Sequence, residues 1–120
     1  MGTKSTIKPL KPSLKEQIRY IAFKIISVKE IKDFSKVNDA VLEHISMFIG
    51  ELGMAKAGPS LIKNKWKQKE QAGVIKVNRR YVDHIKSSLS LIKEINNQRV
   101  IVKSISTSGM INKAGKAIGG

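Results

Sequence analysis

The chain has 120 residues, of which 41% are hydrophobic, so it is long enough to bury one core and too apolar for a disordered chain. It contains no Cys, which excludes a disulfide framework, a thiolate nucleophile and a Cys-ligated zinc site, and it has no apolar run near the roughly 20 residues that span a bilayer. Lys and Arg number 23 against nine Asp and Glu, and the formal net charge of +14 indicates an anionic partner, nucleic acid above all.

The N-terminal part of the chain is predicted to be an arm followed by a strand. Residues 1–17 are polar and basic and contain two of the three prolines, so we expect an extended basic arm. Residues 19–27, RYIAFKIIS, are rich in β-branched and aromatic side chains, which predicts the first strand.

A helix is predicted between Asp33 and Gly53, because apolar residues recur there every three or four positions. Ser35 is its expected N-cap, and Gly53 is the expected first residue past its end. The predicted buried face consists of Val37, Val41, Ile45, Phe48 and Leu52.

Two more strands and a second helix follow. Residues 60–67 alternate in polarity and predict a strand with lysines along one face, and residues 73–78 predict the third strand. The second helix is expected after Asn78, with an exit at the pair Asn96-Asn97. Its apolar stripe consists of Val82, Ile85, Leu89 and Ile92.

The last strand is predicted at residues 99–106, and residues 108–120 are expected to form a basic, Gly-rich tail or a short helix. The order is then βαββαβ, which predicts a single αβ domain over residues 18–107. Two right-handed crossovers in this order give an α/β (α+β) sandwich of the ferredoxin-like type, with a four-stranded antiparallel sheet and both helices packed on one face. The common RNA-recognition domains share this arrangement.

Aromatic side chains are missing where an RNA-recognition domain would show them. Such a domain stacks bases on aromatics of its first and third strands. Here the third strand has none, the first offers only Tyr20 on its outer face, and Phe23, Phe34 and Phe48 are expected in the core or at its edge. The sheet is therefore expected either to be covered by another protein or to meet RNA through charge and shape. The outward-facing residues predicted to meet a protein partner are Tyr20, Ala22 and Val74.

The basic residues are the candidate RNA-binding residues. Nineteen are Lys and four are Arg, and Lys acts on phosphate as a point charge, which favours backbone binding over base reading. They gather along the arm, the second strand, the start of the second helix and the last strand with the tail. The predicted contacts are Lys11, Lys15, Arg19, Lys56, Lys63, Lys65, Lys67, Arg79, Arg80, Lys103 and Lys113.

The titratable side chains offer one candidate for catalysis. His44 and His84 lie one on each predicted helix, so acid–base cleavage of RNA is an alternative, but their spacing fixes no mutual geometry and the simpler interpretation is two helix-flank residues. The acidic residues are scattered and do not form the carboxylate cluster of a two-metal nuclease. We predict no catalytic residue and no metal or cofactor bound by the protein.

Three segments together resemble one family. They are RYIAFKIIS (19–27), GELGMAKAGPSLI (50–62) and the stretch from GVIKVNRRYVDH to STSGMI (73–111). In this order and spacing they are similar to ribonuclease P protein component 2 of archaea, and the resemblance runs from about Lys11 to Ile111. The glycine-rich end beyond Ile111 departs from the family.

The resemblance implies a protein subunit of the ribonucleoprotein endoribonuclease that removes 5′ leaders from precursor tRNA in the cytoplasm. It implies an αβ sandwich without a catalytic residue, because catalysis comes from the ribonuclease P RNA and its magnesium ions. It also implies pairing with a TIM-barrel protein subunit, self-association of such pairs and no membrane partner. The residues alone leave two alternatives open: a general basic RNA-binding module, and a small ribonuclease that uses His44 and His84.

Overall fold

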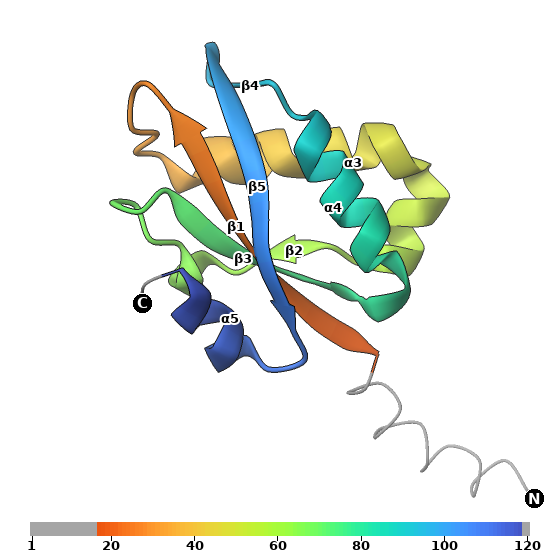
Figure 1. The fold of residues 1–120 in the computed structure, drawn as a ribbon. Helices are drawn as coiled ribbons and strands as arrows, with labels where there is room; N and C mark the ends of the chain where they lie inside the picture. Colours follow the sequence, from red (N-terminus) through yellow and green to blue (C-terminus); the bar gives the residue numbers. More distant parts are fainter. Residues whose placement is uncertain (1–16, 119–120) are drawn as a thin grey trace, which may run out of the picture.

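The computed structural model describes residues 17–118, which form one curled antiparallel sheet with helices on both faces (Figure 1). The five strands are β1 (Ile18–Ser27), β2 (Ser60–Leu61), β3 (Ala72–Asn78), β4 (Glu94–Ile95) and β5 (Gln98–Ser108). The helices are α3 (Phe34–Ala57), α4 (Val82–Leu91) and α5 (Ile111–Ala117), with 3₁₀ turns η1 (Lys63–Lys65) and η2 (Arg79–Tyr81).

The strand order is β2-β3-β1-β5-β4. The first four positions agree with the predicted ferredoxin-like order, but the sheet has five strands where four were predicted. The added strand β4 forms a hairpin with β5, in which Glu94 pairs with Arg99. Asn96 and Asn97 both have positive φ, at 54° and 64°, as the tight turn of a hairpin requires. The prediction that they end the second helix is therefore wrong, since α4 already ends at Leu91.

The predicted second strand is also mostly wrong. Only Ser60 and Leu61 are in a strand, and the chain then makes the turn η1. This turn lets Trp66 pack against two core rings, with centroid distances of 6.4 Å to Phe23 and 6.0 Å to Phe34. Packing of the Trp66 ring outweighs the strand preference that the alternating residues of this segment indicate. The lysines of the segment therefore do not share one strand face.

Helix α3 is longer than predicted and is broken in its middle. Gly50 has φ 77° and ψ 175°, a conformation open in practice only to glycine, and the chain resumes helical geometry after it. The helix ends at Gly58, which has φ 56° and donates its N–H to the Met54 carbonyl at 2.9 Å. The predicted end at Gly53 is wrong: Gly53 is buried within the second segment against Ile49.

The N-cap of α3 is Asp33 rather than Ser35. Asp33 Oδ1 accepts hydrogen bonds from the Ser35 hydroxyl at 2.7 Å and from the Ser35 backbone N–H at 2.9 Å. Both bonds favour the charged carboxylate, and the hydroxyl bond contributes more, so together they lower the pKa of Asp33 below its ordinary value.

One sheet face carries the main core. Strand residues such as Ile21, Phe23 and Ile75 pack there against Ile45 of α3 and Leu89 of α4, all 0% exposed. The N-terminal half of the predicted α3 stripe is confirmed as buried, whereas Phe48 and Leu52, which come just before and after the break at Gly50, are exposed.

The other sheet face is covered in part by α5, whose Ala114 and Ile118 pack against Ala22, Ala72 and Val74. Figure 1 shows α5 across the sheet from α3, near one end of β5. The short helix predicted for the tail is thus present. It also overturns a predicted interface, because Ala22 and Val74 are 0% and 1% exposed beneath it. A partner cannot touch them while α5 is in place.

Two glutamine side chains hold the connection between β1 and α3. The Gln71 amide accepts from the Ile31 N–H at 2.9 Å and donates to the Ile31 carbonyl at 3.0 Å. The Gln98 amide accepts from the Lys29 N–H at 3.1 Å and donates to the Lys29 carbonyl at 2.9 Å. Each amide satisfies the backbone of one loop residue much as a neighbouring strand would.

Candidate nucleic-acid interface

The predicted basic residues are spread over three parts of the structure. Lys11 and Lys15 lie outside the described residues. One group is at the end of the sheet where β1 starts and β3 stops, a second surrounds α5, and a third is on the part of the sheet that α5 leaves open. The predictions for individual RNA contacts stay predictions, because no RNA is present.

The first group contains Arg19, Arg79 and Arg80. Arg19 on β1 pairs with Val77 on β3, and η2 follows β3 directly. The Arg79 N–H donates to the Gln17 carbonyl at 2.6 Å, which ties η2 to the start of β1. Arg79 and Arg80 are exposed, whereas Arg19 is half-buried and donates to the Ile18 carbonyl at 2.8 Å.

The same end of the sheet includes a lysine that sequence reasoning missed. Lys76 is exposed and stands opposite Tyr20 on one side and Ser60 on the other. Tyr20, which was predicted to meet a protein partner, is half-buried beside the α5 contact. Lys56 is exposed in the last turn of α3.

The second group surrounds α5. Lys65 of η1 reaches this helix, since its Nζ lies 3.7 Å from where a Cβ atom on Gly115 would stand. Lys113 and Lys116 are exposed on α5 itself. Lys63 is exposed on η1, and Lys67 is half-buried in an isolated bridge to Ala72. Folding of the tail onto the sheet therefore brings lysines from two distant segments together.

The third group is a pair of lysines on adjacent strands. Lys103 of β5 stands directly opposite Lys24 of β1, and both side chains are exposed. Like charges in this position repel and destabilise a sheet. An anion between or above the two ammonium groups would relieve the repulsion. Lys24 was not among the predicted contacts, because its position opposite Lys103 depends on the strand register.

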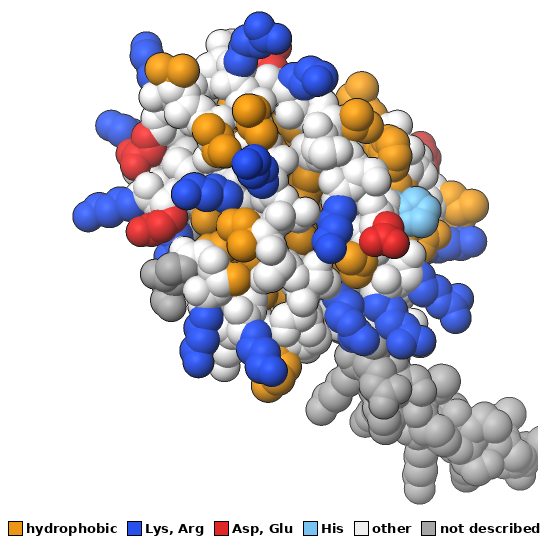
Figure 2. Space-filling view, in the orientation of Figure 1, with side chains coloured by type: hydrophobic (Ala, Val, Ile, Leu, Met, Phe, Trp, Pro, Cys, Tyr) orange, Lys and Arg blue, Asp and Glu red, His pale blue; other side chains and the backbone are white. Residues whose placement is uncertain are grey.

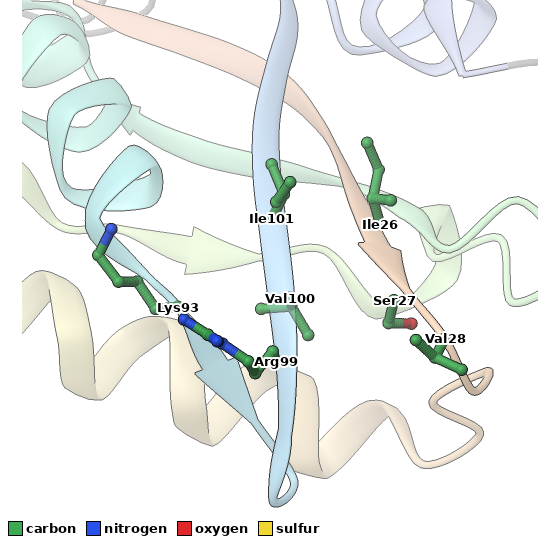
Figure 3. Close-up of a pocket in the computed structure, with 7 residues that line it drawn as sticks. All are labelled: Ile26, Ser27, Val28, Lys93, Arg99, Val100 and Ile101. Atoms are coloured by element: carbon green, nitrogen blue, oxygen red, sulfur yellow. The ribbon is translucent and has the colours of Figure 1, made fainter.

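Apolar side chains continue along the same open face. Ile26 and Ile101, which pair on β1 and β5, are 44% and 57% exposed. With Val28 they line an open hollow of about 470 Å³ whose rim carries Lys93 and Arg99. Figure 3 shows Ile26 and Ile101 on neighbouring strands, with Lys93 and Arg99 to one side. In Figure 2, hydrophobic and basic side chains alternate over this part of the surface.

The two histidines have different surroundings in the structure. His44 is half-buried on α3, and its Nδ1 is 2.8 Å from the Ala40 carbonyl of its own helix. His84 is exposed on α4 and lies in a groove whose lining does not include His44. Among residues 17–118, no three His, Asp or Glu side chains gather closely enough to hold a metal ion.

No helix in the described part of the chain has both the length and the apolar character needed to cross a membrane.

Comparison with known proteins supports the resemblance seen in the sequence. The model of the Rpp14/Pop5 family matches residues 19–119. The chain is 37% identical to ribonuclease P protein component 2 of Pyrococcus abyssi over 111 residues, which cover 92% of this chain and 91% of the relative. It is 38% identical to the protein of that name from Methanocaldococcus jannaschii, covering 90% and 77%.

A chain in the cryo-EM structure of yeast ribonuclease MRP has a similar fold. The TM-score is 0.59 with 14% sequence identity, and the match covers 83% of this chain and 84% of that chain. With the family model matching nearly all of the described residues, the chain belongs to the Rpp14/Pop5 family.

Proposed function

We propose that this chain is a non-catalytic protein subunit of ribonuclease P and supports the catalytic RNA in removing 5′ leaders from precursor tRNA. The observation that carries the proposal is the family match over residues 19–119, joined to relatives named ribonuclease P protein component 2. The excess of positive charge and the missing sheet aromatics support it independently.

The lysines would act by screening phosphate. A folded RNA presents its backbone and its shape, and its helices pack closely only when phosphate repulsion is reduced. The sheet holds the backbone of Lys24 directly opposite that of Lys103, so one anion can meet both ammonium groups. The ferredoxin-like scaffold supplies this rigidity, while magnesium ions and the chemistry of cleavage belong to the RNA.

The remaining partners follow the same proposal. We expect the ribonuclease P RNA and a TIM-barrel protein subunit to be the partners, with self-association of the pair, in the cytoplasm. The open face near Ile26, Val28 and Ile101 replaces Ala22 and Val74 as the surface for the protein partner, because it remains exposed beside α5.

The test is 5′-leader cleavage of a precursor tRNA at limiting magnesium. The samples are the ribonuclease P RNA alone, this protein alone, and the RNA with this protein and its TIM-barrel partner. We expect cleavage only from the mixture. Cleavage by the protein alone would restore the ribonuclease alternative with His44 and His84, and no effect in the mixture would leave a general RNA-binding module.

A pair of variants with equal charge change sharpens the test. The double substitution Lys24→Glu and Lys103→Glu should weaken RNA binding and lower its salt slope by about one per lost phosphate contact. The control is Lys32→Glu with Lys36→Glu, two exposed lysines near the start of α3, where Asp33, Asp39 and Glu43 already line the surface. Equal losses in both variants would mean that net charge alone binds the RNA.

A further inference from the structure

The aromatic side chains divide into separate groups. The chain has one Trp, two Tyr and three Phe. Phe23, Phe34 and Trp66 pack together in the core. Phe48 and Tyr81 instead line an open groove of about 350 Å³ beside His84, where residues of α3 on both sides of Gly50 contribute to the lining. Tyr20, the remaining aromatic residue, is half-buried on β1.

The groove spans the break in α3 at Gly50, with Phe48 before the break and Leu52 after it. Both side chains continue the spacing of Val41 and Ile45, which are fully buried. Phe48 and Leu52 are instead 48% and 69% exposed. A glycine-only backbone conformation inside a helix is costly, and such strain gathers at functional sites.

The surroundings of the groove are basic. Lys56 lines it, and Arg79 and Arg80 come directly before Tyr81 and are exposed. The acidic residues nearest in sequence are Glu51 and Asp83. In Figure 2, blue side chains gather on the lower right of the molecule, close to a histidine and hydrophobic side chains. The groove therefore has one lysine in its lining and two exposed arginines on the turn that contains Tyr81.

Two of the rings that line the groove lie next to each other. The Tyr81 and His84 rings have centroids 5.0 Å apart at an interplanar angle of 46°, so they meet at an angle and do not cover each other. Unpaired nucleotides are bound by a combination of aromatic faces for the base and positive charge for the phosphate. A base-paired helix does not offer its base faces and could use only the charge.

We propose that this groove binds one unpaired nucleotide of an RNA, with the base against Phe48 and Tyr81 and the phosphate near Lys56, Arg79 and Arg80. The proposal rests on the proposed function in that the chain binds RNA, but it names a different kind of contact. A docked protein helix would need an apolar lining but would not account for Lys56 in the lining and two arginines on the adjoining turn.

The experiment compares single-stranded and duplex RNA. The full chain is titrated with a short oligoadenylate that contains one 2-aminopurine, whose fluorescence falls when it stacks, and with an RNA duplex of similar charge. Phe48→Leu keeps an apolar side chain and removes the ring. Met47→Leu is the matched control, because Met47 precedes Phe48, is exposed and does not line the groove.

For the unmodified chain we expect quenching of the 2-aminopurine and a shift of the His84 ring resonances on addition of the oligoadenylate. Loss of one stacking contact should weaken oligoadenylate binding about fivefold or more in Phe48→Leu. Duplex binding by this variant, and both affinities of Met47→Leu, should not change. The shift of His84 in the unmodified chain tests the site even if Phe48→Leu folds poorly.

Two outcomes would overturn the groove proposal and leave the proposed function intact. One is oligoadenylate binding without quenching or a His84 shift. The other is an unchanged oligoadenylate affinity in Phe48→Leu together with weaker binding of the TIM-barrel partner, which would assign the groove to a protein. If the chain binds neither RNA in this assay and also fails to support leader cleavage, the proposed function fails as well.

Discussion

On one face of the sheet, α3 and α4 bury a continuous layer of large apolar side chains, while on the other the seven-residue helix α5 covers mainly alanines and a valine. Beside α5 the second face stays open, with Ile26 and Ile101 exposed next to Lys24 and Lys103. The difference indicates that the two faces of the sheet have different roles. The first face provides the stability that lets the second face keep exposed isoleucines and repelling lysines.

The largest predicted effect tests this difference with one kind of substitution on each face. Ile45→Ala removes a fully buried side chain from the α3 core and should lower the free energy of unfolding by about 2–5 kcal/mol. Ile101→Ala, at an exposed position on the open face, should change it by no more than about 0.5 kcal/mol. Urea denaturation measures both, and similar losses would show that the open face is part of the core.

The second prediction separates α5 from the rest of the fold. Ala114 is fully buried against Ala22 and Val74, so Ala114→Lys should force α5 off the sheet at a cost of about 1–3 kcal/mol. Amide hydrogen exchange should rise in α5 and stay slow in α3. Asn112→Lys adds the same charge at an exposed neighbouring position and should leave α5 docked. Loss of protection in α3 would mean that the two faces fold as one unit.

The third prediction is that one substitution on the open face raises the stability of the fold and lowers its affinity for RNA. Lys24→Glu turns a like-charge pair with Lys103 into an opposite-charge pair, which should stabilise the sheet by about 0.2–1 kcal/mol. RNA affinity should fall at the same time, because a phosphate would now meet a carboxylate. Thermal unfolding and RNA titration measure the two effects. If Lys36→Glu produces the same pair of changes, the cross-strand geometry is not responsible.

The smallest predicted effect concerns Asp33, the N-cap of α3. The lowered pKa of Asp33 means that its charged form stabilises the fold above the ordinary value of 3.8, and this contribution is lost as the pH falls through the lower folded pKa. Asp33→Asn keeps a cap but cannot ionise, so its unfolding midpoint should depend less on pH in this acidic window. A pH dependence equal to that of the unmodified chain would exclude Asp33 as its source.

The sequence predicted the elements whose residue types and spacing indicate a single local structure. The period of the first half of α3 matches its burial, whereas β1 and β3 were recognised by residue type and are buried on both faces where α5 covers them. The break at Gly50 was not predictable, since apolar spacing continues through it and only the backbone angles reveal it. Asn96-Asn97 suits both a helix exit and a hairpin turn, and the pairing of Glu94 with Arg99 selects the turn.

The candidate site was predictable at the level of residue type only. The excess of Lys over Arg indicated phosphate binding, but the opposition of Lys24 and Lys103 depends on a register that includes an irregularity between Ala22 and Phe23. The predicted use of Ala22 and Val74 failed because nothing in the tail sequence says which sheet face α5 covers. Phe48 was assigned to the core by its period, but it is 48% exposed and lines the groove.

The glutamine amides that hold the β1–α3 connection have a consequence for repeated assembly. Gln71 and Gln98 are neutral, so their bonds to Ile31 and Lys29 are not screened by ions, whereas phosphate contacts are lost as ionic strength rises. The loop should therefore keep its shape through cycles of RNA release and rebinding. Its amide hydrogens at Lys29 and Ile31 should exchange slowly although neither residue belongs to a helix or strand.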